Sequence, residues 1–304
     1  MTQQSLPATA GPRSRDAAPS ASRPRRGWLP LLGTVPFFAY TAIFLLLPTV
    51  LVLVGAFRSR EGAFTTNGIT QALSERTLGI FVNSLWVSAL TALVGAVLGA
   101  IIAYALVTAP FGSLGRRVFT AFMSVVAQFG GVMLAFAFIA TFGINGMLTR
   151  LLRQWAGFEV DPGMLSTLAG VALVYCYFQI PLMVIVFLPA LEGLRPQWRE
   201  ATANLGGAAR TYWTRVAGPI LLPSFLGSYL LLFANSFSAF ATAAALISQQ
   251  TIIVPMEIES ALRNENDLGM DAYAQALALG MIIVVALVMW GYARLSRRAS
   301  RWTA

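Results

Sequence analysis

The residues able to do chemistry are few in this sequence, and two of the usual types are missing or nearly so. There is no His, and the single Cys, Cys176, lies inside an apolar run. Without imidazole or a second thiol, the common zinc and haem sites, His-based triads and intrachain disulfides are excluded. We therefore expect no catalytic residue, no metal site and no cofactor.

Lysine is also absent, so that all 21 basic residues are Arg. The phosphate-binding loop of ATPases requires a Gly-Lys-Ser/Thr sequence to hold the phosphates. A standard ATP site is therefore excluded, and any use of ATP must take place on another chain.

The remaining candidates are uncharged polar and aromatic residues within the apolar runs. Each polar residue can form a hydrogen bond between helices, which is the commoner role, or can contact a transported solute. Aromatic faces can bind cations, although in membrane helices they more often pack. The candidate path residues are Gln128, Gln179, Asn235, Ser238, Tyr175 and Phe237, with Ser236 and Thr242 as further polar residues.

These residues must be positioned by membrane helices. Of the 304 residues, 57% are apolar and 11% are charged, with a mean hydropathy of +0.70, whereas soluble domains carry about 25% charged residues. A helix needs roughly 20 apolar residues to cross a bilayer. Six runs predict an all-α integral membrane protein with six transmembrane helices: 31–57, 80–108, 117–143, 165–190, 220–247 and 273–293.

The Arg residues predict the orientation of these helices. Six spans place both termini on one side, and fifteen of the 21 Arg residues lie on that side, in the 1–27 tail, at 116–117, in 195–215 and after 293. Because cytoplasmic loops are rich in Arg and Lys, we expect both termini in the cytoplasm (N-in, C-in). The tail 1–27 is predicted to be disordered, and 295–304 is a basic cytoplasmic tail.

The spans and external loops carry further information. No charged residue lies deep in a span, which argues against an ion-coupled carrier. The loops 58–79 and 144–164 are each expected to contain a short interfacial helix. The acidic loop 248–272 is either simply solvated or a patch that attracts cations or a basic partner.

A basic polar stretch separates the fourth and fifth apolar runs. It comprises residues 195–223, RPQWREATANLGGAARTYWTRVAGPILLP. Its Ala-rich residues 198–205 predict a short helix, and Gly206-Gly207 permits a sharp turn with positive φ. Residues 208–216 predict a second helix, and Pro219 and Pro223 restart the chain into the membrane. We expect a cytoplasmic helical elbow between the fourth and fifth spans.

This stretch resembles the EAA loop of ABC-transporter permeases. The matching residues are Glu200, Ala201, Gly206, Val216 and Pro219, and the sequence departs from the pattern at Thr202 and Gly218. The segment 81–85, FVNSL, resembles the opening of the family's core domain. The resemblance covers about 79–294, which we predict to be the permease core. The preceding residues, 28–78, are predicted to form a first transmembrane helix and an external loop.

The resemblance implies an ATP-driven importer in a bacterial inner membrane. Its implied partners are two ATP-binding cassette subunits, a second permease subunit of the same or another kind, an external solute-binding protein and membrane lipid, with no nucleic acid. The implied docking residues are Glu200, Ala201, Gly206, Gly207, Val216 and Pro219. The alternative for Glu200 is a first-turn acid favoured by the helix dipole.

The segments 234–242 and 179–182 resemble spermidine/putrescine-type permeases, so the solute could be a polyamine. Permeases for ferric iron, thiamine, sulfate or phosphonates share much of the pattern. Two other functions remain open: an ion-coupled secondary transporter and a non-transporting membrane scaffold.

Overall fold

A computed structural model describes residues 29–58, 62–109, 112–157, 161, 163–247, 253–263 and 270–300. The predicted tail 1–27 and the last four residues of the predicted tail 295–304 lie outside this part. The chain divides into two compact units, 1–48 and 49–304. Across the described residues the regular structure is helical, apart from one isolated antiparallel bridge between Arg58 and Phe64.

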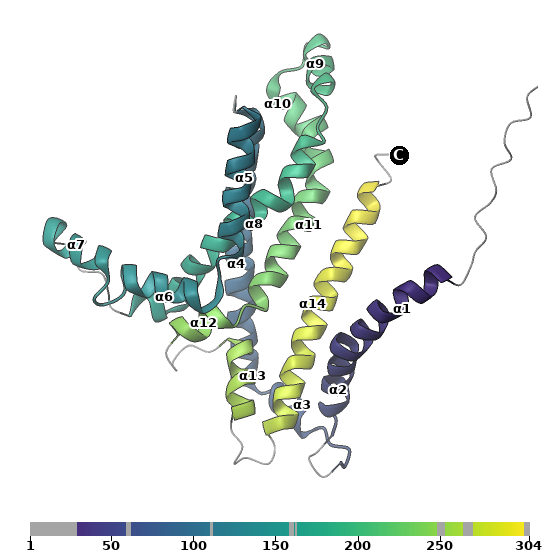
Figure 1. Cartoon of the computed structure of the whole chain (residues 1–304), viewed down its shortest axis with the longest axis vertical. Helices are drawn as coiled ribbons and strands as arrows, with labels where there is room; N and C mark the ends of the chain where they lie inside the picture. The colour runs from purple at the N-terminus through teal and green to yellow at the C-terminus, as the bar shows by residue number, and fades with distance from the viewer. Residues whose placement is uncertain are drawn as a thin grey trace, which may run out of the picture. The chain divides into compact units, whose positions relative to one another are not determined.

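The first unit contains α1 (Leu29–Thr41), a π-helical turn η1 (Ala42–Leu46) and the start of α2 (Leu47–Gly55). The helices of the second unit are α3 (Asn67–Ala72), α4 (Glu75–Thr108), α5 (Ser113–Gln128), α6 (Gly131–Phe142), α7 (Met147–Ala156), η2 (Met164–Ser166), α8 (Leu168–Glu192), α9 (Pro196–Asn204), α10 (Ala209–Tyr212), η3 (Trp213–Ala217), α11 (Gly218–Phe237), α12 (Ala241–Leu246), α13 (Val254–Arg263) and α14 (Met270–Ser300) (Figure 1).

Six helical segments of the described chain are long and apolar enough to cross a membrane, which confirms the predicted number. They are Thr34–Gly55, Glu75–Thr108, Gly131–Trp155, Leu168–Glu192, Ala209–Phe237 and Met270–Arg294. The chain is therefore a multi-pass membrane protein. Short helices also form in both predicted loops, as α3 in the loop 58–79 and α7 in the loop 144–164, but most of α7 lies within the candidate span Gly131–Trp155 instead of forming a separate interfacial helix.

The second unit is built around the contact of α4 with α8, and α11 packs on both helices. Gly95 and Gly99 of α4 make the close approach possible. A Cβ atom on Gly95 would lie 2.7 Å from Cβ of Gln179, and one on Gly99 would lie 2.5 Å from Cβ of Met183. Small residues at such a seam let two backbones approach closely in the membrane.

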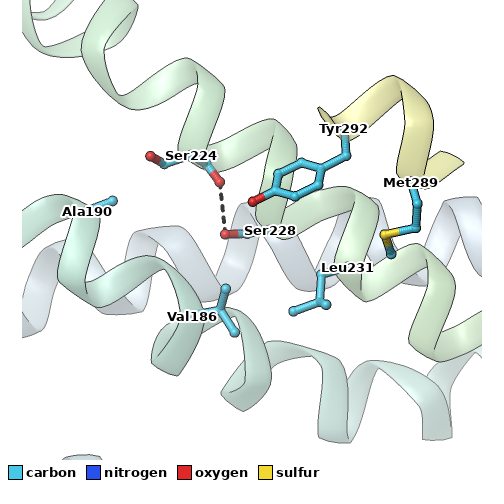
Figure 2. Close-up of a pocket in the computed structure, with 8 residues that line it drawn as sticks. Val186, Ala190, Ser224, Ser228, Leu231, Met289 and Tyr292 are labelled. Carbon is cyan, nitrogen blue, oxygen red and sulfur yellow. Dashed lines mark hydrogen bonds between the residues drawn. The ribbon is translucent and has the colours of Figure 1, made fainter. Parts of the chain in front are cut away.

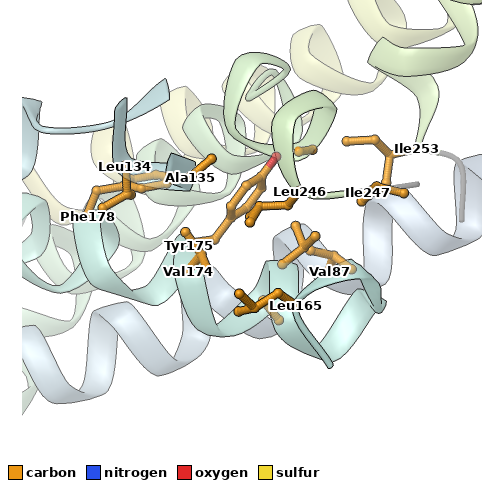
Figure 3. Packing of buried hydrophobic residues seen from close by; sticks show 13 residues of the cluster. Val87, Leu134, Ala135, Leu165, Val174, Tyr175, Phe178, Leu246, Ile247 and Ile253 are labelled. Atoms are coloured by element: carbon orange, nitrogen blue, oxygen red, sulfur yellow. The ribbon is translucent and has the colours of Figure 1, made fainter. Parts of the chain in front are cut away.

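A buried cluster around Tyr175 joins α8 to α4, α6 and α12 (Figure 3). Tyr175 is 1% exposed and packs with Phe178 of α8, Leu134 of α6 and Leu246 of α12. Its hydroxyl donates a hydrogen bond of 2.5 Å to the carbonyl of Ala239. The cluster therefore holds the segment after α11 against the middle of the unit.

The third apolar run, 117–143, is not one helix as predicted. It breaks after Gln128, and Gly131 has a φ of +71°, a conformation that glycine adopts readily. The 16-residue α5 contacts α8, whereas the 12-residue α6 packs on α12. The fifth run, 220–247, is broken in the same way, because α11 ends at Phe237 and α12 starts at Ala241.

Candidate functional site

The predicted elbow is present and projects from the end of the helices (Figure 1). Proline occupies the first turn of α9, where its missing N–H removes no intrahelical bond. The chain then reverses at Gly206, whose φ is +74°, and α10 begins at Ala209. Leu205 at the tip is 88% exposed. An exposed apolar residue on a polar loop suits contact with another protein.

The two elbow glycines are required for different reasons. Gly206 has open space around its Cα hydrogens but a left-handed backbone, which costs a residue with a Cβ about 1–2 kcal/mol. Gly207 lies against Thr202, since a Cβ there would be 2.8 Å from the Thr202 methyl group. Its N–H also donates to the Thr202 carbonyl, at 2.9 Å. Thr202, where the resemblance expects Ala, thus forms the inner wall of the turn.

The other docking candidates differ in exposure. Glu200 and Ala201 are exposed on α9, Val216 is half-buried, and Pro219 is exposed on α11. Arg195, Arg199, Arg210 and Arg215 are exposed as well, with Glu200 as the acid among them. The elbow therefore presents a basic surface with one carboxylate.

The second half of the elbow does not end before Pro219, contrary to the prediction. The segment Ala209–Phe237 is continuous, and it passes through the π-turn η3 immediately before Pro219. Proline has no N–H and its ring clashes with the carbonyl four residues earlier. The wider π-turn relieves that clash, as η1 does before Pro48 in the first unit.

Aromatic contacts anchor the elbow to α4. Tyr212 is buried, and the ring of Trp213 meets Tyr104 edge-to-face with 5.2 Å between centroids. Together with the continuous helix, this contact connects α10 both to α11 and to the last part of α4.

Sequence reasoning missed an ion pair beside the elbow. Nη1 of Arg116, in α5, lies 3.3 Å from Oε1 of Glu192, the last residue of α8. Arg116 also donates through Nη2 to the carbonyls of Leu106 and Val107 at the end of α4, at 3.3 and 3.2 Å. The only signal in the sequence was an acid at the end of one apolar run and an Arg pair at the start of another.

The six path candidates fall into two groups. Gln128, Asn235 and Ser238 are exposed, at or near the ends of α5 and α11. Tyr175, Gln179 and Phe237 are buried within the chain, each at most 1% exposed. Nε2 of Gln179 donates to the carbonyl of Leu232 at 2.8 Å, while its Oε1 is buried without a partner.

Other polar residues in the spans make hydrogen bonds between segments. The hydroxyls of Thr91 and Ser236 are 2.9 Å apart, which joins α4 to α11. Thr242 donates to the carbonyl of Gly131 at 3.2 Å, which joins α12 to α6. For these residues the structure supports the hydrogen-bonding role.

The acidic loop 248–272 is only partly solvated. It contains α13, where Glu257 is buried and accepts a 3.1 Å hydrogen bond from the Tyr273 hydroxyl. That hydroxyl also lies 2.9 Å from Oγ1 of Thr77. Glu259 pairs with Arg263 on the same helix. Two further acids of this loop, Glu265 and Asp267, lie outside the described residues.

Comparisons with known proteins confirm the resemblance to ABC-transporter permeases. The sulfate transport system permease protein CysW of Synechocystis is 25% identical over 257 residues, 82% of this chain and 87% of the relative. The spermidine/putrescine transport system permease protein PotB of Haemophilus influenzae is 21% identical over 277 residues, 87% of this chain and 93% of the relative. No family model matches the chain.

The fold is that of a solved importer. A bacterial ABC transporter involved in import of the acidic polysaccharide alginate superposes with a TM-score of 0.71 at 17% identity, over 91% of this chain and 96% of the other. A bacterial alginate ABC transporter in complex with an alginate pentasaccharide-bound periplasmic protein superposes with a TM-score of 0.70 at 19% identity, over 89% of this chain and 94% of the other.

Proposed function

We propose that this chain, which is similar in sequence and fold to the permease subunits of ABC transporters, is the transmembrane permease subunit of an ATP-driven importer of a small solute. The observation that carries the proposal is the elbow. An exposed turn at Gly206 is separated by only two residues from a continuous membrane-crossing helix, Ala209–Phe237. A partner that moves the turn therefore moves the membrane helix directly.

ATP hydrolysis belongs on separate subunits in this proposal. The chain lacks the Lys of a phosphate-binding loop, so it is not itself the ATPase. Two ATP-binding cassette subunits dock on elbows from two permease subunits, which are identical or homologous. Glu200 provides the polar contact, and Ala201, Gly206, Gly207, Val216 and Pro219 shape the surface and its connection to α11.

The proposal includes the orientation of the chain in the membrane and the side from which solute is delivered. The Arg-rich elbow lies in the cytoplasm, with both termini on that side (N-in, C-in), in the inner membrane of a bacterium. A solute-binding protein delivers the solute on the opposite face. The solved alginate transporter bound to its periplasmic protein supports this partner.

A polyamine is the first solute to test, because segments 234–242 and 179–182 resemble polyamine permeases. Sulfate is the matched alternative, since the sulfate permease CysW is similar over most of the chain. Gln128, Asn235 and Ser238 are the path candidates with exposed side chains, and they can contact a solute without rearrangement of the core. Tyr175 and Phe237 would need α11 to move first.

The test reconstitutes the permease with its ATPase and binding protein in proteoliposomes. Glu200→Ala should lower ATPase binding and ATP-driven uptake at least tenfold. Glu75→Ala, which removes an exposed acid from the start of α4, is the matched control and should leave both unchanged. Full uptake by the Glu200→Ala variant would show that docking does not depend on this residue.

The two alternatives predict other outcomes. A secondary transporter would take up solute along an ion gradient with the ATPase omitted. A scaffold would neither transport nor change ATPase activity when solute and binding protein are added. Solute-dependent stimulation of ATP hydrolysis would exclude both.

A further inference from the structure

The C-terminal end of α4 is contacted by both the elbow and α5. The ring of Trp213, the first residue of the π-turn η3, meets the Tyr104 ring edge-to-face with 5.2 Å between centroids. Arg116 of α5 donates through Nη2 to two carbonyls at the same helix end, those of Leu106 and Val107, at 3.3 and 3.2 Å. Figure 1 shows the start of α5 at the same end of the helices as the elbow. One helix end therefore joins two segments that are distant in sequence.

Apolar packing joins the same three segments. Trp213 of η3, Val107 of α4 and Met123 of α5 pack against one buried cluster, to which Leu191 of α8 also belongs. Close-packed interiors have low compressibility and transmit strain. The Arg116 guanidinium adds bonds of fixed direction, because its donors form a rigid planar fork. A displacement of Trp213 can therefore reach α5 through the end of α4.

Helix α5 leads from this end of α4 to a path candidate. Arg116 lies near its start and Gln128 is its last residue, in one uninterrupted helix. A rise of about 1.5 Å per residue places these two residues about 18 Å apart along the axis. The Gln128 side chain is exposed. The other exposed path candidates, Asn235 and Ser238, lie at the end of α11, which the elbow reaches directly through Ala209–Phe237.

We propose that the C-terminal end of α4 forms a second coupling route from the elbow into the membrane. Trp213 passes a displacement of the elbow to Tyr104, and Arg116 passes it from α4 to α5. These three are positioning residues, since they move the transport path without touching the solute. The inference rests on the proposed function, because an ATPase has to displace the elbow. One displacement then moves both α11 and α5, the helices that present the exposed path candidates.

The experiment labels single thiols in the permease assembled with its ATPase in proteoliposomes. Cys176, the single cysteine, is first replaced by Ser. Gln128→Cys then reports on α5, and Ser238→Cys reports on the end of α11; both positions are exposed. The rate of labelling by N-ethylmaleimide is measured with and without ATP. ATP should change this rate by about threefold or more at both positions, because helix shifts change the exposure of a side chain.

Two variants interrupt the route at different contacts. Tyr104→Leu removes the ring contact and leaves the hydrogen bonds of Arg116 in place, whereas Arg116→Gln does the reverse. Each should abolish the effect of ATP at position 128 and keep it at position 238. Tyr104→Phe keeps the ring and should keep both effects. A response retained at position 238 shows that the ATPase still docks and that the chain is folded.

Two control variants remove matched side chains outside the route. Arg117→Gln removes the neighbouring exposed Arg of α5. Tyr292→Leu removes a tyrosine that is 40% exposed, as Tyr104 is, and whose ring lies on α11, where a Cβ atom at Gly227 would overlap it (Figure 2). Both controls should respond to ATP at position 128 as the Cys176→Ser background does.

The outcomes separate this inference from the proposed function. Absence of an ATP effect at both positions in the Cys176→Ser background would contradict the proposed function itself. An effect at position 238 but not at 128, or an effect at 128 that survives either Tyr104→Leu or Arg116→Gln, would overturn the second route alone. Loss of both effects in Tyr104→Leu, or of the position-128 effect in a control, would do the same. Helicity and elution volume of each variant are measured first, and Tyr104→Leu decides alone should Arg116→Gln fail to fold.

Discussion

The guanidinium of Arg116 and the carboxylate of Glu192 meet at 3.3 Å, where the start of α5 reaches the end of α8. The same guanidinium donates to the carbonyls of Leu106 and Val107, which end α4. Helix ends leave carbonyls without intrahelical partners, and a cation there is favourable. Arg116 therefore joins three helices immediately before the elbow.

We predict that Arg116→Ala destabilises the protein more than Glu192→Ala. Loss of Arg116 removes the two bonds to carbonyls and should cost about 1–2 kcal/mol. Loss of Glu192 removes only a half-exposed ion pair and should cost less than about 1 kcal/mol. Unfolding by SDS titration in mixed micelles measures both. Arg117→Ala is the control, and equal costs for the two variants would contradict the prediction.

The second prediction concerns the turn of the elbow. Gly206→Ala should lower coupled uptake because it strains a backbone with φ of +74° by about 1–2 kcal/mol. Gly207→Ala should act through contact with Thr202 instead. The double change Gly207→Ala with Thr202→Ser removes the methyl group at 2.8 Å but keeps the carbonyl oxygen of residue 202 at 2.9 Å, so it should recover only part of the uptake. The Thr202→Ser change should not rescue Gly206→Ala.

The predicted elbow shows what local chemistry in the sequence can determine. The short helix before Gly206 and the turn at Gly206 itself follow from residue propensities, and the structure has both. The continuity from Ala209 to Phe237 could not be predicted the same way. Proline lacks the N–H that an interior helical position donates, so the sequence favoured a restart at Pro219, whereas the structure has a π-turn at Trp213–Ala217 that leads directly into α11.

The breaks in the third and fifth apolar runs show what hydropathy alone does not predict. Hydropathy reports that a residue is apolar but not the direction of its helix, so 117–143 and 220–247 appeared as single spans. Gly130-Gly131 was a visible signal for the first break. The second break depends on contacts distant in sequence, such as the hydrogen bond from Tyr175 to Ala239. The ion pair of Arg116 and Glu192 also required the packed helices.

The third prediction tests the seam between α4 and α8. Gly99→Ala should destabilise the protein by about 1–3 kcal/mol, because its Cβ would lie 2.5 Å from Cβ of Met183. Gly79→Ala in the same helix meets no atom within 4 Å and should be neutral or stabilising by up to about 1 kcal/mol. The difference between these two variants in SDS titration isolates the seam from helix propensity.

Gln179 allows the packing and transport roles to be separated, which is the fourth prediction. Its Nε2 donates to the Leu232 carbonyl at 2.8 Å, but its Oε1 is buried without a partner. An unpaired buried acceptor costs about 1–3 kcal/mol, and this offsets the gain from the hydrogen bond that the amide does make. Gln179→Met, of similar volume, should therefore change the free energy of unfolding by less than about 1 kcal/mol.

Gln179→Ala should instead cost about 2–3 kcal/mol, because it leaves a cavity beside Gly95 in the α4–α8 contact. If Gln179 only packs, uptake by Gln179→Met should keep its apparent KM for the solute. A rise of more than fivefold in KM with unchanged stability would assign Gln179 to the translocation path. Asn235→Ala is the comparison. Because Asn235 is exposed, its replacement should leave the unfolding curve unchanged, and it should raise the KM for the solute if Asn235 lines the path.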